Sequence, residues 1–213
     1  MKKDRIFWGT VAPLAAVVSS LLLVSVILIL RGANPIDIFQ VMISYGFDPR
    51  NLVSELNQTV SYYLAGVAAA IGFKMLLFNI GIDGQYRMGA FFGAVVGAAV
   101  SLPPVLHVLL IVITAMLAGG LWAAIDGYLK VRRGVSEVIS NIMLNFISAA
   151  IIAFLLGEDL LGILPEGSQN VQTRPIPLSG QMPTFKMFNG EVYSFLFVAI
   201  FVGIAYWIML NKT

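Results

Sequence analysis

Four polar residues repeat along one stretch of the chain at a spacing that places them on one face of a helix. Glu137, Asn141, Asn145 and Ser148 stand at offsets 0, 4, 8 and 11, at the start of a stretch that stays free of charge from Val138 to Gly157. At 100° per residue they share an arc of about 80°. An unpaired polar group in hydrocarbon is costly, so this face turns toward protein or a wet path. Hydrogen bonding between helices and the lining of a substrate route both explain the pattern.

A second polar segment lies between two apolar stretches. The residues from Phe78 to Tyr86 include Asn79, Asp83 and Gln85 together with two glycines. This composition does not continue a stable membrane helix, and irregular backbone at membrane depth is tolerated only where protein or a water-filled cavity covers it. The segment is therefore either a cytoplasmic turn or a broken helix that presents backbone groups to a ligand.

Small residues form a stripe in the stretch that follows. Gly89, Gly93 and Gly97 recur every four residues, so one face of a helix has almost no side-chain bulk. Another helix can approach this face closely. Tight packing within one bundle explains the stripe, and so does a surface that slides during a conformational change.

The composition removes most enzymatic alternatives. The chain has no cysteine and one histidine, so thiolate metal sites, cysteine nucleophiles and a Ser-His-Asp triad lack their residues. We therefore expect no catalytic residue, no metal site and no cofactor bound by this chain. The Gly-Lys-Ser or Gly-Lys-Thr triplet of a phosphate-binding loop is also missing from the sequence, so any ATP hydrolysis that drives this protein belongs to another subunit.

Long charge-free stretches decide the fold class. Hydrophobic residues make up 59% of the 213 residues and charged residues 11%, about half the usual charged share. A helix that crosses a membrane needs roughly 20 apolar residues, and Pro103-Pro104 divides the longest stretch in two. The sequence predicts an all-α polytopic membrane protein with a single transmembrane domain over 1–213. Its expected spans are about six: 6–30, 60–80, 86–102, 105–128, 137–157 and 192–211.

The basic residues orient these spans. With a cytoplasmic N-terminus, the inner ends carry nine of the 13 Lys and Arg residues and the outer loops carry four, which favours cytoplasmic N- and C-termini. Arg132, Arg133 and Glu137 then mark a cytoplasmic loop and helix start. In the outer loop 31–59, partial helical periodicity predicts an interfacial helix. The outer loop 158–191 contains four prolines and is expected to be extended surface structure, and His107 is expected at the outer interface.

Two motifs resemble segments of a known family. Phe78-Asn-Ile-Gly-Ile-Asp-Gly-Gln85, followed by Met88-Gly-Ala90, resembles the F-N-I-G-x-E-G-Q…G-A signature of ABC importer permeases of the branched-chain amino acid, ribose and nucleoside type. Gly134-Val-Ser-Glu-Val-Ile-Ser-Asn-Ile-Met-Leu-Asn145 resembles the G-V-N-E-V-I-x-T-I-M-L-N-Y segment of its nucleoside and simple-sugar branch. Asp83 stands where the family has Glu, and Ser136 and Asn141 stand where it has Asn and Thr.

The resemblance implies a permease subunit in the plasma membrane that forms the translocation path for nucleosides or simple sugars. Its implied partners are ABC ATPase subunits that bind ATP and Mg²⁺, a second permease subunit or copy, and an extracytoplasmic substrate-binding protein or lipoprotein. Family permeases are longer, so we expect these residues to be the N-terminal portion of a longer permease. An uncharged, hydroxyl-rich substrate suits hydrogen bonding, and the residues expected along its path are Asn79, Asp83, Gln85, Asn141 and Asn145.

Two other classes of protein compete with this interpretation. An ATP-independent secondary transporter or channel would use Lys74, Asp83 and Glu137 as coupling groups. A non-transporting membrane scaffold would show no substrate-dependent stimulation of ATPase activity. Within the permease family itself, a branched-chain amino acid is the alternative substrate. Neither competing class accounts for both motifs.

Overall fold

The computed structural model describes residues 2–157 and 160–212, with side chains for 11–157 and 160–211. The first two residues of the expected outer loop 158–191 lie outside the described residues, and so do the side chains of the basic N-terminus. Contacts divide the chain into two compact units. The first comprises Met1–Ser54 and Phe188–Gly190, and the second comprises Glu55–Met187 and Glu191–Thr213.

The first unit contains two helices and the start of a third. The helix α1 covers Lys2–Leu30, α2 covers Pro35–Gly46, and α3, Pro49–Lys74, begins here and continues into the second unit. Asn34 caps α2, because its side-chain Oδ1 accepts a hydrogen bond from the Ile36 amide at 3.1 Å and proline at the first helical position needs no partner. No residue of α2 is buried. The helix predicted within 31–59 is thus present, with both faces exposed.

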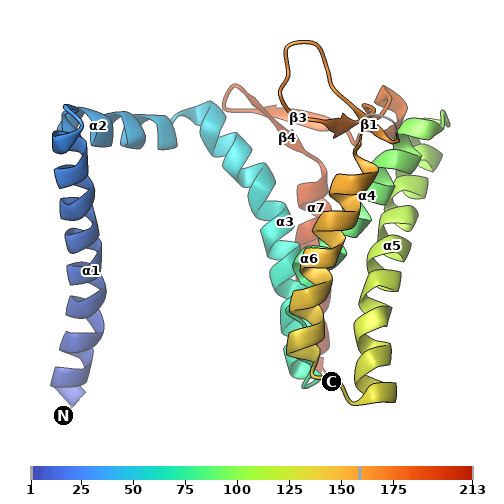
Figure 1. Cartoon of the computed structure of the whole chain (residues 1–213), viewed down its shortest axis with the longest axis horizontal. Coiled ribbons are helices and arrows are strands. Elements are labelled where there is room, and N and C mark those ends of the chain that lie inside the picture. Colours follow the sequence, from blue (N-terminus) through green and yellow to red (C-terminus); the bar gives the residue numbers. More distant parts are fainter. Residues whose placement is uncertain (1, 158–159, 213) are drawn as a thin grey trace. The chain divides into compact units, whose positions relative to one another are not determined.

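The second unit is a bundle of helices. Beside most of α3 it contains α4 (Ile82–Ala99), α5 (Pro104–Arg133), α6 (Glu137–Leu155) and α7 (Phe195–Lys212). The helices α4, α5 and α6 lie side by side (Figure 1). Pro104 stands at the start of α5, and Gly134 ends this helix in the left-handed conformation at φ +64°, which glycine adopts without a steric penalty.

The connection from α6 to α7 forms two short hairpins. The strand β1 (Gly162–Ile163) pairs antiparallel with β2 (Gln172–Thr173), and β3 (Thr184–Met187) pairs with β4 (Gly190–Tyr193). A 3₁₀ helix, η1, covers Leu178–Gly180 between the hairpins. In the second unit this connection lies at one end of the bundle, and the α5–α6 turn lies at the other (Figure 1). The extended surface structure expected for 158–191 is therefore organised into hairpins.

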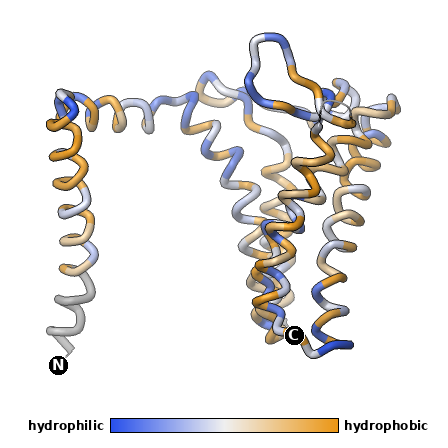
Figure 2. The backbone as a smooth tube through the Cα atoms, in the orientation of Figure 1, coloured by the Kyte–Doolittle hydropathy of each residue, from blue (hydrophilic) through white to orange (hydrophobic). Residues whose placement is uncertain are grey.

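Within the part of the chain that the structure describes, three helices are long and apolar enough to cross a membrane: Val11–Leu30, Pro104–Arg133 and Glu137–Leu155. The apolar helix Phe195–Asn211 is slightly shorter. The remaining two predicted spans are more polar, and Figure 2 shows hydrophilic residues along the first half of α3. In α4, Asp83 and Arg87 lie in the first two turns of an 18-residue helix. These helices are present where spans were expected, but their hydropathy is below that of a lipid-facing span.

Several predicted boundaries were wrong by a turn or more. The span expected over 60–80 starts at Pro49 and ends at Lys74, so 75–81 is not helical. The span expected over 86–102 begins at Ile82 and ends at Ala99, and α5 runs on past 128 to Arg133. The first of these differences matters most, because it creates a non-helical connection between α3 and α4. We call residues 75–81 the linker.

Candidate functional site

The linker begins at an unusual helix end. The amide of Leu77 donates a hydrogen bond to the Gly72 carbonyl at 2.9 Å, and the amide of Leu76 donates one to the Phe73 carbonyl at 3.1 Å. This pair of bonds is the Schellman motif, in which the penultimate residue adopts a left-handed conformation. Leu76 occupies that position at φ +57°, where glycine is usual. The helix α3 therefore ends in a sharp turn at Leu76. Leucine is not a residue type from which a helix end would be predicted.

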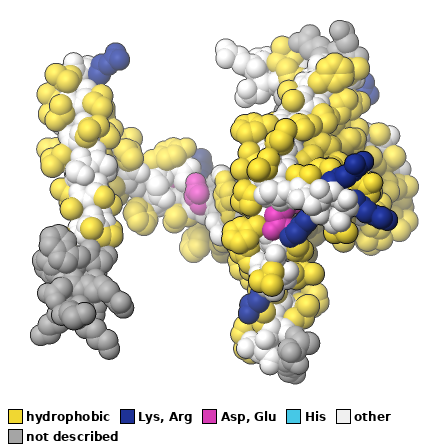
Figure 3. Space-filling view, turned by 60° about the horizontal axis from the view of Figure 1, so that its bottom comes forward, with side chains coloured by type: hydrophobic (Ala, Val, Ile, Leu, Met, Phe, Trp, Pro, Cys, Tyr) yellow, Lys and Arg dark blue, Asp and Glu magenta, His cyan; other side chains and the backbone are white. Residues whose placement is uncertain are grey.

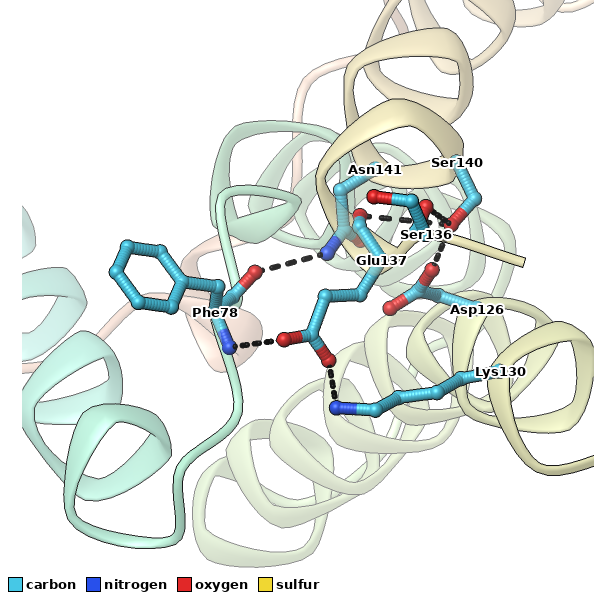
Figure 4. A network of polar contacts seen from close by, with 7 residues as sticks. All are labelled: Phe78, Asp126, Lys130, Ser136, Glu137, Ser140 and Asn141. Atoms are coloured by element: carbon cyan, nitrogen blue, oxygen red, sulfur yellow. Dashed lines mark hydrogen bonds and ion pairs between the residues drawn. The ribbon is translucent and has the colours of Figure 1, made fainter. Parts of the chain in front are cut away.

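Polar side chains of α6 hold the linker along its length, as Figure 4 shows for the first part. The Phe78 amide donates a hydrogen bond to Glu137 Oε1 at 2.9 Å, and the Phe78 carbonyl accepts a longer one, 3.4 Å, from Asn141 Nδ2. One turn further on, Asn145 Nδ2 donates to the Ile80 carbonyl at 3.1 Å. Three members of the polar stripe, spaced one turn apart, thus bind backbone groups of Phe78 and Ile80 in the linker.

Asn145 also fixes the start of α4. Its Oδ1 accepts a hydrogen bond from the Gly84 amide at 2.9 Å, which satisfies one of the amides that a helix leaves free at its first turn. Glycine is needed at this approach, because a Cβ on residue 84 would lie 2.7 Å from Asn145 Oδ1. Gly81 is restricted in the same way by the Asn141 amide. The two glycines of the segment therefore make room for two asparagines of α6.

Asn79 and Gln85 bind each other across the bend. Asn79 Nδ2 donates to Gln85 Oε1 at 3.2 Å, and Gln85 Nε2 donates to Asn79 Oδ1 at 3.0 Å. The Gly81 amide also donates to Asn79 Oδ1, at 3.1 Å. Four of the five residues expected on the substrate path are therefore brought together around the linker, where their amides bind other groups of this chain. Their contact with substrate stays a prediction.

The N-terminal turn of α6 is tied to the C-terminal turns of α5. Lys130 forms an ion pair with Glu137, and the Ser140 hydroxyl donates to a carboxylate oxygen of Asp126 (Figure 4). Asp126 and Lys130 are four residues apart on α5 and so lie on one face of it. The sequence had not singled out Asp126. The sequence feature that could have identified Asp126 is its position four residues before Lys130, near the turn that leads to the polar stripe of α6.

Basic residues surround this end of the bundle. Arg132 and Arg133, in the last turn of α5, are both exposed. Figure 3 shows Lys and Arg side chains gathered around an acidic one at this end of the second unit. Cations near the last carbonyls of a helix also interact favourably with its dipole.

The glycine stripe of α4 packs against α5. A Cβ on Gly89 would lie 2.9 Å from the carbonyl oxygen of Ala115, and one on Gly93 would lie 3.3 Å from the Ala115 Cβ. At Gly97 the nearest atoms belong to the Ile111 side chain, at 2.7 Å. The three glycines are buried. This close approach of two backbones is the geometry that small residues permit.

The side chain of His107, which was expected at the outer interface, is fully buried. His107 Nε2 lies 2.9 Å from the Gly97 carbonyl oxygen, and Nδ1 lies 2.9 Å from the Ser179 hydroxyl. A carbonyl oxygen only accepts, so Nε2 donates to Gly97. His107, on α5, thus connects η1 with the C-terminal end of α4. No pattern in the sequence pairs it with Ser179, 72 residues away.

Asp83 differs from the other predicted path residues, because it faces an open groove between α3 and α4. It forms an ion pair at 2.9 Å with Arg87, one turn along α4, and both side chains are about half exposed, 56% and 53%. Among the described residues there is no group of three or more His, Cys, Asp or Glu side chains that could hold a metal ion.

These features define a mostly helical membrane protein in which a non-helical linker joins α3 to α4. A family model matches residues 51–213, so the chain belongs to the family described as the permease component of the branched-chain amino acid transport system. Proteins of this family are integral to the plasma membrane. The resemblance found in the two motifs is confirmed.

Three of the curated relatives are named for the compounds that they transport. The chain is 31% identical over 215 residues to a glucose ABC transporter permease protein of Haloferax volcanii, a match that covers 97% of this chain and 56% of the relative. It is 30% identical to a guanosine ABC transporter permease protein of Bacillus subtilis, a match that covers 94% of this chain and 58% of the relative. A nucleoside ABC transporter permease protein of Lactococcus lactis is 32% identical over 68% of this chain and 40% of its own length. The chain thus spans somewhat more than half the length of the first two relatives. No solved structure matches it.

Proposed function

We propose that this chain forms part of the translocation path of an ATP-driven importer for nucleosides or simple sugars. The observation that supports this most directly is the similarity over nearly the whole chain to permeases named for glucose and guanosine. Such a permease is a transport subunit with no catalytic residue of its own. The partners we propose are ATPase subunits that bind ATP and Mg²⁺, a second permease subunit or copy, and an extracytoplasmic binding protein or lipoprotein.

The proposed topology has six crossings with both ends of the chain in the cytoplasm. The basic end of α5, with Lys130, Arg132 and Arg133, would face the cytoplasm under the positive-inside rule. The hairpins of the 160–191 connection, at the other end of the bundle (Figure 1), would then face outward and meet the binding protein. The helix α2, with no buried residue, would lie in the interface.

The packing indicates which elements would move during transport. The helices α4 and α5 pack closely along the glycine stripe, and α6 is hydrogen-bonded to both α5 and the linker. By contrast, α3 has a cavity of about 530 Å³ on its side toward α7 and one of about 540 Å³ toward α4. Motion of α3 against a rigid unit of α4, α5 and α6 is therefore the form of alternating access that the packing favours.

The test is uptake by the complete transporter, expressed with its ATPase and binding-protein subunits in cells that lack their own nucleoside uptake. We expect uptake of labelled guanosine or glucose that stops when ATP is depleted and continues when the proton gradient is collapsed. Uptake with the opposite dependence would establish the secondary-transporter alternative. A complex that assembles but transports neither compound, nor a branched-chain amino acid, would support the scaffold alternative.

A further inference from the structure

An open groove of about 540 Å³ lies between α3 and the start of α4. Its polar and aromatic lining consists of Gln58, Ser61 and Tyr62 from α3 and Asp83, Tyr86 and Arg87 from α4. The volume falls in the range of ~300–1,000 Å³ that is usual for small-molecule sites. The lining combines two aromatic rings with a few hydrogen-bonding groups, which is the composition expected of such a site.

The polar groups of this groove are free to bind a ligand. Asp83 and Arg87 form an ion pair with each other and are otherwise open. Within the described part of the chain, the side chains of Gln58 and Ser61 make no hydrogen bond. The rings of Tyr62 and Tyr86 are 74% and 57% exposed. The side-chain amides around the linker differ, because each makes at least one hydrogen bond within this chain. Among their buried atoms in the described residues, Asn141 Oδ1 has no partner.

The groove lies near the level of the middle of α5. The carbonyl oxygen of Gln85 approaches Gly119 so closely that a Cβ there would lie 3.0 Å from it. Gly119 is midway along the 30-residue α5, about 20 Å from either end at 1.5 Å per residue. With α5 crossing the membrane as proposed, the Asp83–Arg87 ion pair lies within the thickness of the bilayer. Charges at this depth face water or protein, since facing lipid is too costly, so the groove is part of the wet interior of the assembled transporter.

We propose that this groove binds a nucleoside during translocation, with the base stacked on Tyr62 or Tyr86. This inference rests on the proposed function and specifies its substrate class. An aromatic face binds a base by stacking, and the Arg87 guanidinium and Asp83 carboxylate supply donors and acceptors for the polar edge of the base. Gln58 and Ser61 provide further hydrogen bonds for ribose hydroxyls. A simple sugar would use these hydrogen bonds but has no planar ring to occupy two tyrosine faces.

The first test is guanosine uptake by the complete transporter carrying Tyr62→Leu or Tyr86→Leu. We expect at least one of these changes to raise the KM for guanosine about tenfold or more, the size of effect that loss of base stacking produces. Tyr86→Phe keeps the ring and should stay close to wild type. The matched control is Tyr128→Leu, because Tyr128 is 60% exposed on α5 and lies outside the groove lining. Unchanged KM values in both leucine variants at normal expression would overturn the proposal.

The second test uses the absence of cysteine from this sequence. Gln58→Cys in the same complex should react with a charged methanethiosulfonate reagent, and guanosine should slow that reaction at least several-fold while glucose should not. A thiol at position 128 is the control and should react at the same rate with and without guanosine. Protection by glucose and not by guanosine would overturn the nucleoside assignment. Guanosine uptake without any protection of the thiol would overturn the proposal that the groove binds the nucleoside, but it would leave the proposed function intact. Absence of ATP-driven uptake by the unsubstituted complex would contradict the proposed function itself.

Discussion

Asn145 is the residue on which the start of α4 depends. Its amide accepts from Gly84 and donates to the Ile80 carbonyl. Replacement by alanine leaves both backbone groups without this partner. Gly84 is buried, and an unsatisfied buried group costs about 1–3 kcal/mol, whereas Ile80 is exposed and its carbonyl can bind water. We expect Asn145→Ala to lower the free energy of unfolding by ~2 kcal/mol or more and to lower the melting temperature in detergent.

The matched control for this change is Asn211→Ala. Asn211 is an exposed asparagine of α7 whose side chain donates only to the Trp207 carbonyl of its own helix. Exposed substitutions of this kind usually change stability by ~0.5 kcal/mol or less. Equal melting temperatures for the two variants would show that the hydrogen bonds of Asn145 contribute nothing to holding the linker.

A second prediction at the level of single residues concerns His107. His107→Ala removes both the hydrogen bond to the Gly97 carbonyl and the one to the Ser179 hydroxyl, so η1 should detach from the ends of α4 and α5. We expect proteases added to the outer face to cut the 160–191 connection faster, and the binding protein to dock more weakly. Ser179→Ala removes only one of the two bonds and should show a smaller change in the same direction. A His107→Ala variant with wild-type cleavage would contradict this role.

The polar residues of the site were predictable from sequence only in part. The spacing of Glu137, Asn141 and Asn145 indicated one face that avoids lipid, and the structure places that face against the linker. The binding partner of this face could not be predicted, because almost every residue has a backbone amide and a carbonyl. Residue types therefore do not show which of these groups a side chain will bind. Tyr62 and Tyr86 were also missed, since an aromatic residue in an apolar helix looks the same whether it faces lipid or a groove.

At the scale of elements, the largest error concerned where α3 ends. The glycine nearest to Lys74 is Gly72, which lies inside the helix, and the helix ends through a left-handed leucine at position 76. A tertiary contact explains this, because the linker that follows gains hydrogen bonds from α6 that a longer α3 could not make. The end of α5 was easier to anticipate, since Gly134 follows a basic last turn.

The close packing of α4 against α5 predicts how the protein responds to a larger residue in their contact. Gly89→Ala would place a Cβ 2.9 Å from the Ala115 carbonyl oxygen, so the helices must separate. Overpacking of this kind costs about 1–3 kcal/mol, and we expect lower thermal stability and reduced uptake. In the control, Gly120→Ala, no atom lies within 4 Å of the new methyl group, and the better helix propensity of alanine should leave stability unchanged or raise it by up to ~1 kcal/mol. Destabilisation by both variants alike would contradict the role of the stripe.

At the scale of the whole molecule, composition fixed the class of protein but not the number of crossings. The helices α1, α5 and α6 have spans that are apolar enough to be recognised alone. The helices α3 and α4 are not, because they carry the polar residues of the groove. A transport path must be lined by polar groups, so the helices that form it are the ones that a hydropathy criterion recognises least readily.

The topology gives a prediction for the entire chain. Because the sequence has no cysteine, single thiols can be placed at Gln169, exposed in the connection between β1 and β2, and at Arg133, exposed at the end of α5. Applied to intact cells that express the complete transporter, a membrane-impermeant maleimide should label Gln169→Cys at once. It should label Arg133→Cys only after the membrane is permeabilised, because the positive-inside rule places the basic end of α5 in the cytoplasm. The reverse pattern would invert the proposed orientation, and labelling of both sites in intact cells would mean that α5 and α6 do not separate the two positions by a bilayer.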